Sequence, residues 1–309
     1  MMTLSIVIPT FNTAAMTLAC CRAAIAAAPA SEIIVVDDAS IDGTRAILNA
    51  ELPDVRVVRL ESNARFAGAA NAGVAVARGD IVLLLNSDTR IESAAPAALL
   101  DAFARDERLG IAGARLLNVD GTPQWSGGPL PTLLWLAVMV SGSARFLPRR
   151  SRVSNGEVAW VSGAAMAFRR ETWNDAGPLN ESYRFYAQDL ELCARARRAG
   201  WRVRIVEDAR VAHEGGATMP RDPGLLWLDL LQWGRAYYGR RWAAWARWFM
   251  AAMAVLRIAA RRVTGSTTGE YRRALRQLFA EREKVADQGV GGVPALDQPP
   301  SGVTDRSRP

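Results

Sequence analysis

The first 88 residues of the chain alternate short apolar segments with longer segments of helical pattern. The apolar segments are rich in β-branched residues and span 4–8, 32–36, 55–60 and 81–85. The helical patterns span 14–28, 44–50 and 67–78. Segment 81–85 is apolar at every position, which is typical of a strand buried on both faces. Because strands that alternate with helices predict a parallel sheet covered by helices, the sequence indicates an α/β fold.

The pattern changes twice further along the chain. Beyond residue 110 we expect strands or extended segments at 110–117, 157–161, 165–169, 201–206 and 210–213, and a helix at 189–199. The chain of 309 residues is long enough for one large or two small domains. We expect a main domain over 1–220, a helical extension over 221–285 that ends in a charged, solvated helix at 270–284, and a tail over 286–309 whose composition is typical of disorder.

The composition excludes several classes of protein. Half of the residues are hydrophobic, which excludes a disordered or collagen-like chain. The formal charge of +7 favours an anionic partner: nucleic acid, anionic lipid or a phosphate-bearing substrate. The arginines gather with tryptophans and leucines in helical segments and form no recognisable nucleic-acid motif, so we expect no nucleic-acid partner.

The cysteines and the N-terminus predict a cytoplasmic protein. Cys20, Cys21 and Cys193 lack the CxxC spacing of a zinc ribbon, and we expect buried, reduced thiols. We expect no secretory leader, because segment 4–8 is too short for one. No uninterrupted apolar run reaches the roughly 20 residues that a membrane-spanning helix needs.

Polar residues follow three of the predicted strands directly. They are Pro9-Thr10-Phe11-Asn12, Asp37-Asp38 and Asn86-Ser87-Asp88. Ligands of open α/β sheets bind beyond the carboxyl ends of the strands. Asp37 and Asp38 predict either a capped turn into residues 40–44 or hydrogen bonds to a nucleotide base or ribose.

Asp88 and His213 are candidate metal ligands. Asn86-Ser87-Asp88 follows a buried strand, which favours a divalent cation that carries a diphosphate; a plain turn is the alternative. His213 is the only histidine of the chain and ends an extended segment. Its neutral imidazole could complete a Mn²⁺ site with Asp88, although a lone histidine is more often simply packed or solvated.

Asp189 is a candidate general base. It stands with Glu191 in the first turn of a predicted helix, where acidic residues favour the helix dipole. The functional alternative is that Asp189, preceded by aromatic residues, takes a proton from an acceptor hydroxyl.

Taken in order, these segments resemble a known enzyme family. The motifs that carry the resemblance lie at 5–12, 35–44, 63–73, 84–89, 162–166, 177–181, 189–195 and 211–213. Together they resemble the family 2 inverting glycosyltransferases of the GT-A fold, and within that family the rhamnosyltransferase-like and related cell-envelope enzymes. The resemblance covers residues 1–215 and implies a Rossmann-like, mostly parallel sheet, with a nucleotide-sugar half at 1–115 and an acceptor half at 116–220.

The resemblance also implies roles for individual residues. It implies a nucleoside-diphosphate sugar as donor, Mn²⁺ or Mg²⁺ on Asp88 and His213, inversion at the anomeric carbon, and Asp189 as the base. The residues implied on the donor side are Pro9, Thr10, Phe11, Asn12, Asp37, Asp38, Asn63, Phe66, Gly68, Asn71, Asn86 and Ser87. Those implied on the acceptor side are Gly163, Gln188 and Glu191. Gln188 departs from the family, which often has glutamate at this position.

Two segments favour contact with a membrane and therefore a lipid-linked or other cell-envelope saccharide as acceptor. Residues 130–140 are apolar and are followed by Arg145, Arg149 and Arg150. Segment 225–262 mixes arginine with Trp227, Trp233, Trp242, Trp245 and Trp248, a pair of residue types found at membrane interfaces. We expect a peripheral protein on the inner face of the cell membrane. The alternative is that both segments pack on the main domain or form an oligomer interface.

A nucleotide-binding oxidoreductase is excluded, because it would carry GxGxxG after the first strand, where this chain has Pro9-Thr10-Phe11-Asn12. Two other functions remain as alternatives. A sugar nucleotidyltransferase would carry a glycine-rich basic loop there, and an inactive scaffold would not need Asp88, Asp189 and His213. The donor sugar stays open: rhamnose activated by dTDP is our expectation, with UDP and GDP sugars as alternatives.

Overall fold

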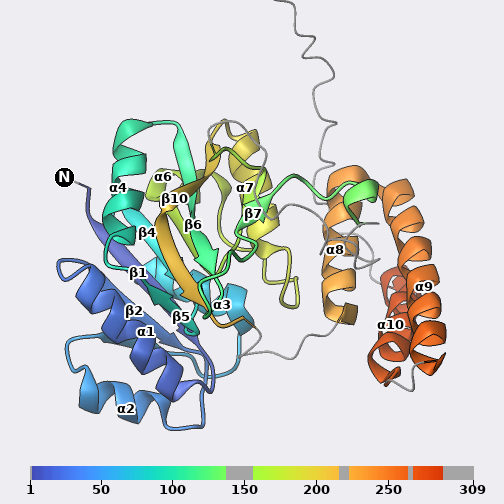
Figure 1. The fold of residues 1–309 in the computed structure, drawn as a ribbon, viewed down its shortest axis with the longest axis horizontal. Coiled ribbons are helices and arrows are strands. Elements are labelled where there is room, and N and C mark those ends of the chain that lie inside the picture. Colours follow the sequence, from blue (N-terminus) through green and yellow to red (C-terminus); the bar gives the residue numbers. More distant parts are fainter. Residues whose placement is uncertain (1, 137–155, 216–222, 264–266, 288–309) are drawn as a thin grey trace, which may run out of the picture. The chain divides into compact units, whose positions relative to one another are not determined.

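The computed structural model describes residues 2–136, 156–215, 223–263 and 267–287 (Figure 1). The described residues form two compact units. The first contains the described residues up to Thr132 and those from Gly156 to Gly215. The second contains the described residues from Leu133 to Leu136 and the helices from Pro223 onward.

An eight-stranded sheet forms the centre of the first unit. In spatial order its strands are β3 (Arg56–Arg59), β2 (Glu32–Asp37), β1 (Leu4–Thr10), β4 (Ile81–Leu85), β9 (Ala165–Arg169), β6 (Leu109–Leu117), β10 (Arg202–His213) and β5 (Thr89–Ile91). The first four strands are parallel, and so are β6 and β10. Strand β9 is antiparallel to both of its neighbours, and β5 is antiparallel to β10. The predicted mostly parallel α/β fold is therefore confirmed.

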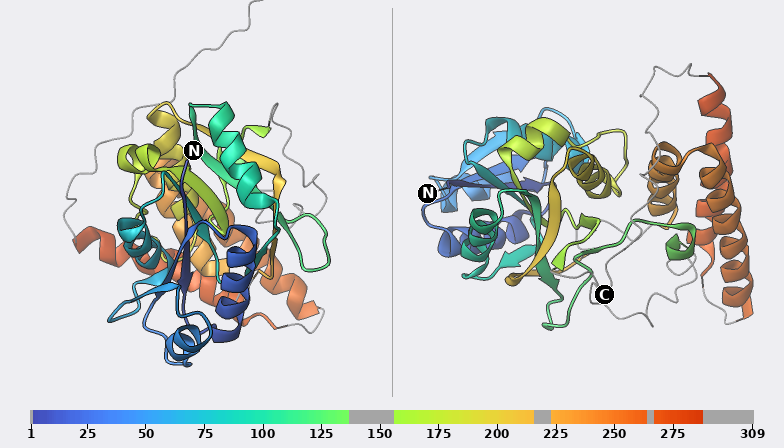
Figure 2. Two further views of the ribbon diagram at one scale, coloured as in Figure 1. Left: turned by 90° about the vertical axis from the view of Figure 1, so that its left-hand side faces the viewer. Right: turned by 90° about the horizontal axis from the view of Figure 1, so that it is seen from above.

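Helices cover both faces of this sheet, as Figures 1 and 2 show. They are α1 (Ala14–Ala27), α2 (Thr44–Glu51), α3 (Arg65–Val76), α4 (Ala95–Arg105), α6 (Arg170–Ala176) and α7 (Gln188–Arg198). Ile6 and Leu83 pack in one core with α1, α2 and α4, while Val7 and Leu84 pack in the other with α3, α6 and α7. Burial on both faces explains why segment 81–85 is apolar throughout.

Several elements differ from the sequence expectations. Residues 201–206 and 210–213 belong to one strand, β10, whose pairing with β6 shifts in register between Val206 and Arg210. The strand expected at 157–161 is reduced to β8 (Trp160–Val161), which pairs with β7 (Gly127–Gly128). The sequence analysis missed β5, α4 and α6. Strand β5 is only three residues long, so it carries too little pattern to be recognised.

The second unit is built mainly from three helices that pack on one another, α8 (Pro223–Tyr238), α9 (Arg240–Val263) and α10 (Gly269–Asp287) (Figure 2). The ring of Trp242 fills the space beside Gly234, where an added Cβ would lie 1.9 Å from the ring atom Cζ3. A glycine is therefore required where α8 and α9 approach each other. The membrane-facing role expected for Trp227 and Trp233 is wrong, because both side chains are buried.

Two further findings concern this unit. Helix α10 is not simply solvated as expected, because it buries Tyr271, Ala274 and Leu278. Arginines interrupt the apolar residues of α9, yet by length and composition alone Arg240–Arg262 is long and apolar enough to cross a membrane. Residues 137–155, with Arg145, Arg149 and Arg150, and most of the expected tail at 286–309 lie outside the described residues.

Candidate active site

One edge of the sheet collects the predicted site residues. The carboxyl ends of β1, β2 and β4 point to this edge because the three strands are parallel. Strand β9 starts here, since Leu85 of β4 pairs with Ala165. The end of β10 lies here as well, because His213 pairs with Thr89. Residues far apart in the sequence thus lie together beyond the carboxyl ends of the strands, where ligands of open α/β sheets bind.

The neighbouring acids Asp37 and Asp38 have different surroundings. Asp37 is buried, and its carboxylate accepts hydrogen bonds from the backbone N–H of Ser40 at 2.9 Å and from Arg59 at 2.5 Å. Asp38 accepts a 2.6 Å hydrogen bond from the N–H of Ala64. Burial raises the pKa of Asp38, although its backbone hydrogen bonds oppose the shift. Asp37 therefore holds the turn together, while Asp38 remains a candidate for contact with a ligand.

The loop after β1 is fixed by its own polar groups. The Thr10 hydroxyl lies 2.6 Å from that of Thr17, inside a buried cluster. Asn12 receives the N–H of Ile41 on its side-chain oxygen at 2.8 Å and donates its own N–H to Ser40 Oγ at 2.9 Å. Pro9 is buried in the strand, whereas Phe11 is 44% exposed. Of residues 9–12, Phe11 presents the most apolar surface to a ligand at this edge.

Four residues around this edge have a left-handed backbone. Asn12, Ala39, Arg65 and Ala187 have φ values of 53°, 62°, 61° and 68°, and they are the non-glycine residues of positive φ within the described part of the chain. Each follows or precedes an element that carries a site residue. This conformation costs an L-residue about 1–2 kcal/mol. Backbone strain of this kind gathers at functional sites.

The start of α3 contributes a turn and a close contact. Asn63 is exposed and accepts the N–H of Arg65 at 3.1 Å on its side-chain oxygen. An added Cβ on Gly68 would lie 2.6 Å from the Cβ of Ala64, so this position needs a glycine. An added Cβ on Gly163 would lie 3.5 Å from the Phe66 ring. The second contact brings the first turn of α3 next to the loop before β9.

The side chain of Asn71 makes hydrogen bonds within the protein. Its amide donates to the backbone oxygen of Leu179 at 2.9 Å and to Glu181 Oε1 at 2.8 Å, and its oxygen accepts the N–H of Leu179 at 2.9 Å. These bonds tie α3 to the loop at 177–181. Both amide protons are already used, so the geometry favours a structural role over direct contact with a nucleotide.

Asp88 and His213 face each other. Nε2 of His213 lies 3.4 Å from Oδ1 of Asp88, whose side chain is 1% exposed. Oδ1 has no hydrogen-bond partner among the described residues. Beside this pair, Ser87 lies 3.1 Å from the Thr13 hydroxyl, and the N–H of Asn86 donates to the backbone oxygen of Ala164 at 3.0 Å.

Gln124 determines which nitrogen of His213 carries the proton. The Gln124 amide nitrogen lies 3.0 Å from Asn118 Oδ1 and 3.3 Å from the backbone oxygen of His213, so its oxygen Oε1 faces His213 Nδ1 at 2.6 Å. Oε1 can only accept, so Nδ1 carries the hydrogen. In the neutral ring, the lone pair of Nε2 then points at Asp88.

This arrangement fits a divalent cation. Two electron-pair donors that face each other at 3.4 Å repel unless the imidazole is protonated or a cation lies between or beside them. A carboxylate oxygen and an imidazole nitrogen are suitable ligands for Mn²⁺, and the oxygen also suits Mg²⁺. The described residues contain no group of three or more His, Cys, Asp or Glu side chains that could hold a metal. A cation here therefore needs further ligands from a substrate or from water.

Asp189 is held by two backbone groups. Its Oδ2 accepts the N–H of Gly163 at 2.9 Å, and its Oδ1 accepts the N–H of Leu190 at 2.8 Å. Burial raises the pKa of Asp189, and these hydrogen bonds oppose the shift only in part. Each oxygen keeps a free lone pair, so the carboxylate can still accept a proton. A fixed carboxylate with a raised pKa is suited to act as a general base.

The side chains of Gln188 and Glu191 each lack one hydrogen-bond partner. Gln188 is buried, and its side-chain nitrogen has no hydrogen-bond partner in the described part of the chain. Glu191 accepts a hydrogen bond from Asn180 on Oε1 at 3.3 Å, while its Oε2 lies 3.9 Å from Arg195 and has no hydrogen-bond partner among the described residues. Both residues therefore remain candidates for contact with a substrate.

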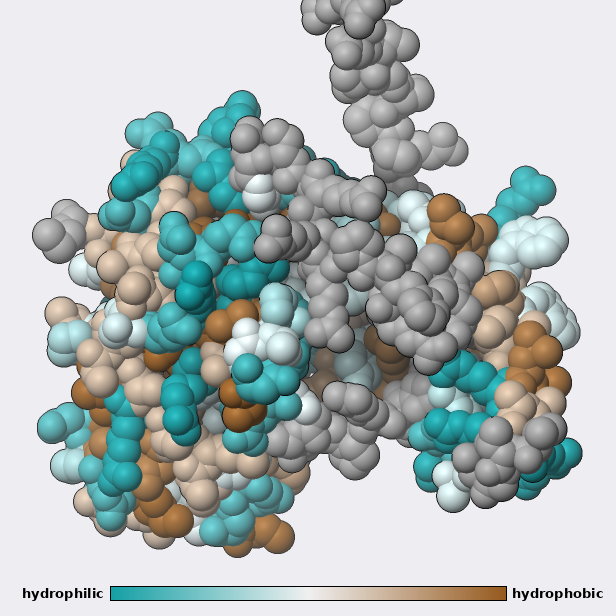
Figure 3. Space-filling model, viewed as in Figure 1, coloured by the Kyte–Doolittle hydropathy of each residue, from teal (hydrophilic) through white to brown (hydrophobic). Residues whose placement is uncertain are grey.

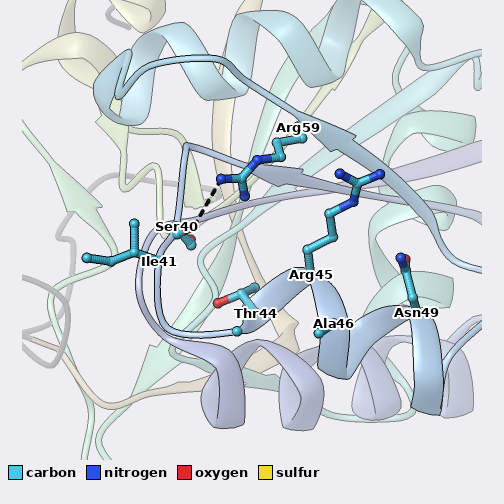
Figure 4. A pocket seen from close by; sticks show the side chains of 8 residues that line it. Ser40, Ile41, Thr44, Arg45, Ala46, Asn49 and Arg59 are labelled. Carbon is cyan, nitrogen blue, oxygen red and sulfur yellow. Dashed lines mark hydrogen bonds between the residues drawn. The ribbon is translucent and has the colours of Figure 1, made fainter.

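A hollow of about 380 Å³ lies beside Asp37 (Figure 4). It is lined by Ser40, Ile41, Gly43, Thr44, Arg45, Ala46, Asn49 and Arg59. Arg59 also donates a hydrogen bond to the backbone oxygen of Ser40 at 3.2 Å. The lining includes neither the Asp88–His213 pair nor Asp189, so this hollow lies apart from the proposed chemistry.

The sequence analysis missed two residues of this edge, Gln124 and Arg59. The register of β2 and β3 pairs Asp37 with Arg59, and the position of both residues near the ends of neighbouring predicted strands was a signal for that pairing. Gln124 lies in a loop, and no pattern in the sequence points to it.

Comparison with known proteins supports this description. N-acetylglucosaminyl-diphospho-decaprenol L-rhamnosyltransferase of Mycobacterium tuberculosis is 28% identical over 212 residues, 62% of this chain and 69% of the relative. Among solved structures, the mannosyltransferase PcManGT of Pyrobaculum calidifontis in complex with GDP-Man and Mn²⁺ matches 93% of this chain and 87% of its own, with a TM-score of 0.56 and 19% identity.

A second solved structure, GalNAc-T7 with UDP, GalNAc and Mn²⁺, has a TM-score of 0.50 and 18% identity. The match covers 69% of this chain, which spans less than half of that one, 44%. At these identities the two solved structures bear on the fold alone. The family model of glycosyl transferase family 2 matches residues 5–175, more than half of the chain. The chain is therefore a glycosyltransferase and belongs to glycosyl transferase family 2.

Proposed function

We propose that this enzyme transfers a sugar from a nucleoside-diphosphate donor to a hydroxyl group of a lipid-linked or other cell-envelope saccharide, with inversion at the anomeric carbon. The observation that carries the proposal is the unpartnered, buried Oδ1 of Asp88 facing His213, at the sheet edge that also bears Asp189. The relative from Mycobacterium tuberculosis supports rhamnose as the sugar and a diphospho-lipid saccharide as the acceptor.

Asp88 and His213 would hold Mn²⁺ or Mg²⁺, and Gln124 keeps the lone pair of His213 Nε2 directed at the site. Mn²⁺ in the complexes of both solved structures supports this assignment. When bound, the cation offsets the negative charge that grows on the departing diphosphate. On the donor side, Asp38, Asn63 and Phe11 are the candidates for contact with the base and ribose.

Asp189 would take the proton from the acceptor hydroxyl. As the proton moves to the carboxylate, the hydroxyl oxygen forms a bond to the anomeric carbon, and the bond from that carbon to the diphosphate oxygen breaks. The nucleophile and leaving group occupy opposite faces, so the configuration inverts without a covalent enzyme intermediate. The backbone bonds from Gly163 and Leu190 keep the base in place for this step. General-base assistance of this kind accelerates a reaction about 10²–10⁴-fold.

A thermal-shift experiment tests the donor site. The unfolding temperature is measured with dTDP, UDP, GDP or NAD, each with and without Mn²⁺ or Mg²⁺. A ligand at 100 times its dissociation constant adds about 2.7 kcal/mol to the unfolding free energy. We expect metal-dependent stabilisation by one nucleoside diphosphate, with the largest shift from dTDP.

Two variants test whether the metal-dependent shift depends on Asp88. Asp88→Ala should lose the metal-dependent shift, whereas Asp54→Ala, which removes an exposed acid before β3, should keep it. No shift with any diphosphate, or a response to NAD alone, would overturn the proposed site. Incubation of the enzyme with dTDP-rhamnose and an N-acetylglucosaminyl-diphospho-lipid then tests the acceptor, and NMR of the product determines the anomeric configuration.

A further inference from the structure

Helix α9 presents an apolar face that stays largely exposed among the described residues, although Trp248 of this face also contacts Phe279 of α10. The exposed positions between Arg241 and Arg262 are mainly apolar and include Trp245, Trp248, Val255 and Leu256, with exposed fractions of 69%, 61%, 53% and 60%. Exposed alanines at 244, 252 and 259 lie on the same side of the helix. At 3.6 residues per turn these positions form one stripe about 120° wide. We call this stripe the outer face; Figure 3 shows brown side chains over α9.

The arginines between the ends of the outer face point the other way. The guanidinium of Arg257 donates to the hydroxyl of Tyr271 and lies 5.2 Å from the centre of that ring. Arg261 lies 2.6 Å from Glu270 of α10 and 4.9 Å from the centre of the same ring. A surface helix in water normally turns its charges outward and its apolar stripe inward. In the described part of α9 this order is partly reversed, since no charged side chain interrupts the outer face between its ends.

The position of α10 distinguishes a helix that lies on a membrane from one that crosses it. Tyr271 at the start of α10 contacts Arg257 and Arg261, while Phe279, further along, contacts Trp248 at 5.3 Å between ring centres. Helix α10 therefore runs back along α9. Its exposed residues include Arg272, Arg273 and Arg276. If α9 crossed the bilayer, these charges would be drawn to the depth of the hydrocarbon, which is unfavourable.

We propose that the outer face of α9 lies in the interface of an anionic lipid bilayer, parallel to the membrane plane. Trp245 and Trp248 would sit among the headgroups, where tryptophan is favoured, and Val255 and Leu256 would reach the top of the acyl chains. Exposed Arg240, Arg241 and Arg262 lie at the two ends of the face and match negatively charged headgroups.

A second copy of the chain fits this face less well. Two copies related by a twofold axis across the helices would pair their α9 helices antiparallel, so that Arg241 of one copy would lie opposite Arg262 of the other. Those like charges would repel each other, whereas anionic headgroups neutralise them. The formal charge of +7 on the whole chain also favours an anionic surface.

This inference deepens the proposed function, because it names the surface that would bring the enzyme to a lipid-linked acceptor. It is tested by co-sedimentation of the full chain with vesicles of phosphatidylcholine alone or with 30% phosphatidylglycerol. We expect binding to the anionic vesicles that weakens with added salt. Trp245→Glu should weaken the binding more than 10-fold, because it places a charge within the apolar face at a position that is 69% exposed.

Ala236→Glu is the matched control, because it adds the same charge at an exposed position of α8. It should bind within about twofold of the wild type; an equal loss in both variants, or none in Trp245→Glu, would overturn the proposal. Resistance of the membrane-bound protein to alkaline carbonate would instead show a spanning helix, and a dimer dissociated by Trp245→Glu would show that a second copy covers the face. Nucleotide stabilisation measured on the same variant separates loss of docking from failure of the donor site.

Discussion

A buried aspartate lies at or just after the end of both β2 and β4, and the two carboxylates differ in their hydrogen-bond partners. Asp37 has a partner on each oxygen, from Ser40 and Arg59. Asp88 is as deeply buried, yet its Oδ1 has no hydrogen bond in the part of the chain that the structure describes. Burial alone therefore does not identify a functional carboxylate. An unsatisfied lone pair does so better, because leaving one buried costs about 1–3 kcal/mol.

The largest effect is expected at the base. Asp189→Asn removes the proton acceptor, so kcat should fall about 10²–10⁴-fold. Stabilisation by dTDP with Mn²⁺ should be unchanged, since Asp189 lies outside the Asp88–His213 pair. Steady-state kinetics and thermal shifts on one preparation check both results. Residual activity within 10-fold of the wild type would show that another group accepts the proton.

The next largest effect is expected at the Asp88–His213 pair, which lies after the end of β4. Gln124→Leu removes the acceptor for Nδ1–H of His213, and loss of such a partner typically weakens metal affinity 10–100-fold. Gln124→Glu keeps an acceptor at this position and should retain affinity within a few-fold. The amount of free Mn²⁺ in the presence of dTDP, measured by electron paramagnetic resonance, checks the prediction. Equal affinities of Gln124→Leu and the wild type would mean that the ring needs no fixed tautomer.

A smaller effect, on the free energy of unfolding, is expected at Asp37 at the end of β2, where both carboxylate oxygens accept hydrogen bonds. Asp37→Ala leaves the N–H of Ser40 and the guanidinium of Arg59 without this partner, so the unfolding free energy should fall by about 1–3 kcal/mol. Asp88→Ala, in the metal-free protein, should cause no comparable loss, since Oδ1 makes no hydrogen bond there. Urea denaturation measures both. If Asp88→Ala were the more destabilising change, the contrast between the two strand ends would be wrong.

The last prediction concerns pH. Burial raises the pKa of Asp189 above the ordinary value of about 3.9. Only the deprotonated carboxylate can accept a proton, so kcat/KM should fall as the pH drops through this raised value. The acid limb of the profile should thus lie at a higher pH than the pKa of an ordinary aspartate, under conditions where thermal unfolding shows the enzyme intact. A limb at the ordinary value would mean that Asp189 is well solvated when substrate binds.

The sequence predicts the elements that have strong local signals. Segments 81–85 and 165–169 form strands as predicted, because the first is apolar throughout and the second is apolar up to Arg169. The rule that ligands bind at strand ends also brings Asp88 and His213 to one edge, although a long stretch of sequence separates them. Strand β5 is too short to show a pattern. Helix α4 was missed although Ala95, Leu99 and Phe103 repeat at helical spacing.

The sequence does not predict side-chain contacts between residues of different helices and strands. The different surroundings of Asp37 and Asp38 depend on where Arg59 and Ala64 lie in space. The tryptophans after residue 225 were recognised, but which of them are buried depends on how α8, α9 and α10 pack. Trp233 points into that packing and Trp245 away from it, and nothing in their local sequence distinguishes the two.

The buried cysteines have a practical consequence. Cys20, Cys21 and Cys193 are free thiols with no exposed surface, as the sequence predicts. Burial raises the pKa of Cys20 and of Cys193 to about 12 and that of Cys21 well above its usual range. Because the thiolate is the reactive form, maleimide dyes near neutral pH should leave all three untouched. A single cysteine introduced in place of Val255 would then carry the only fluorophore, and the natural protein already serves as its own unlabelled background.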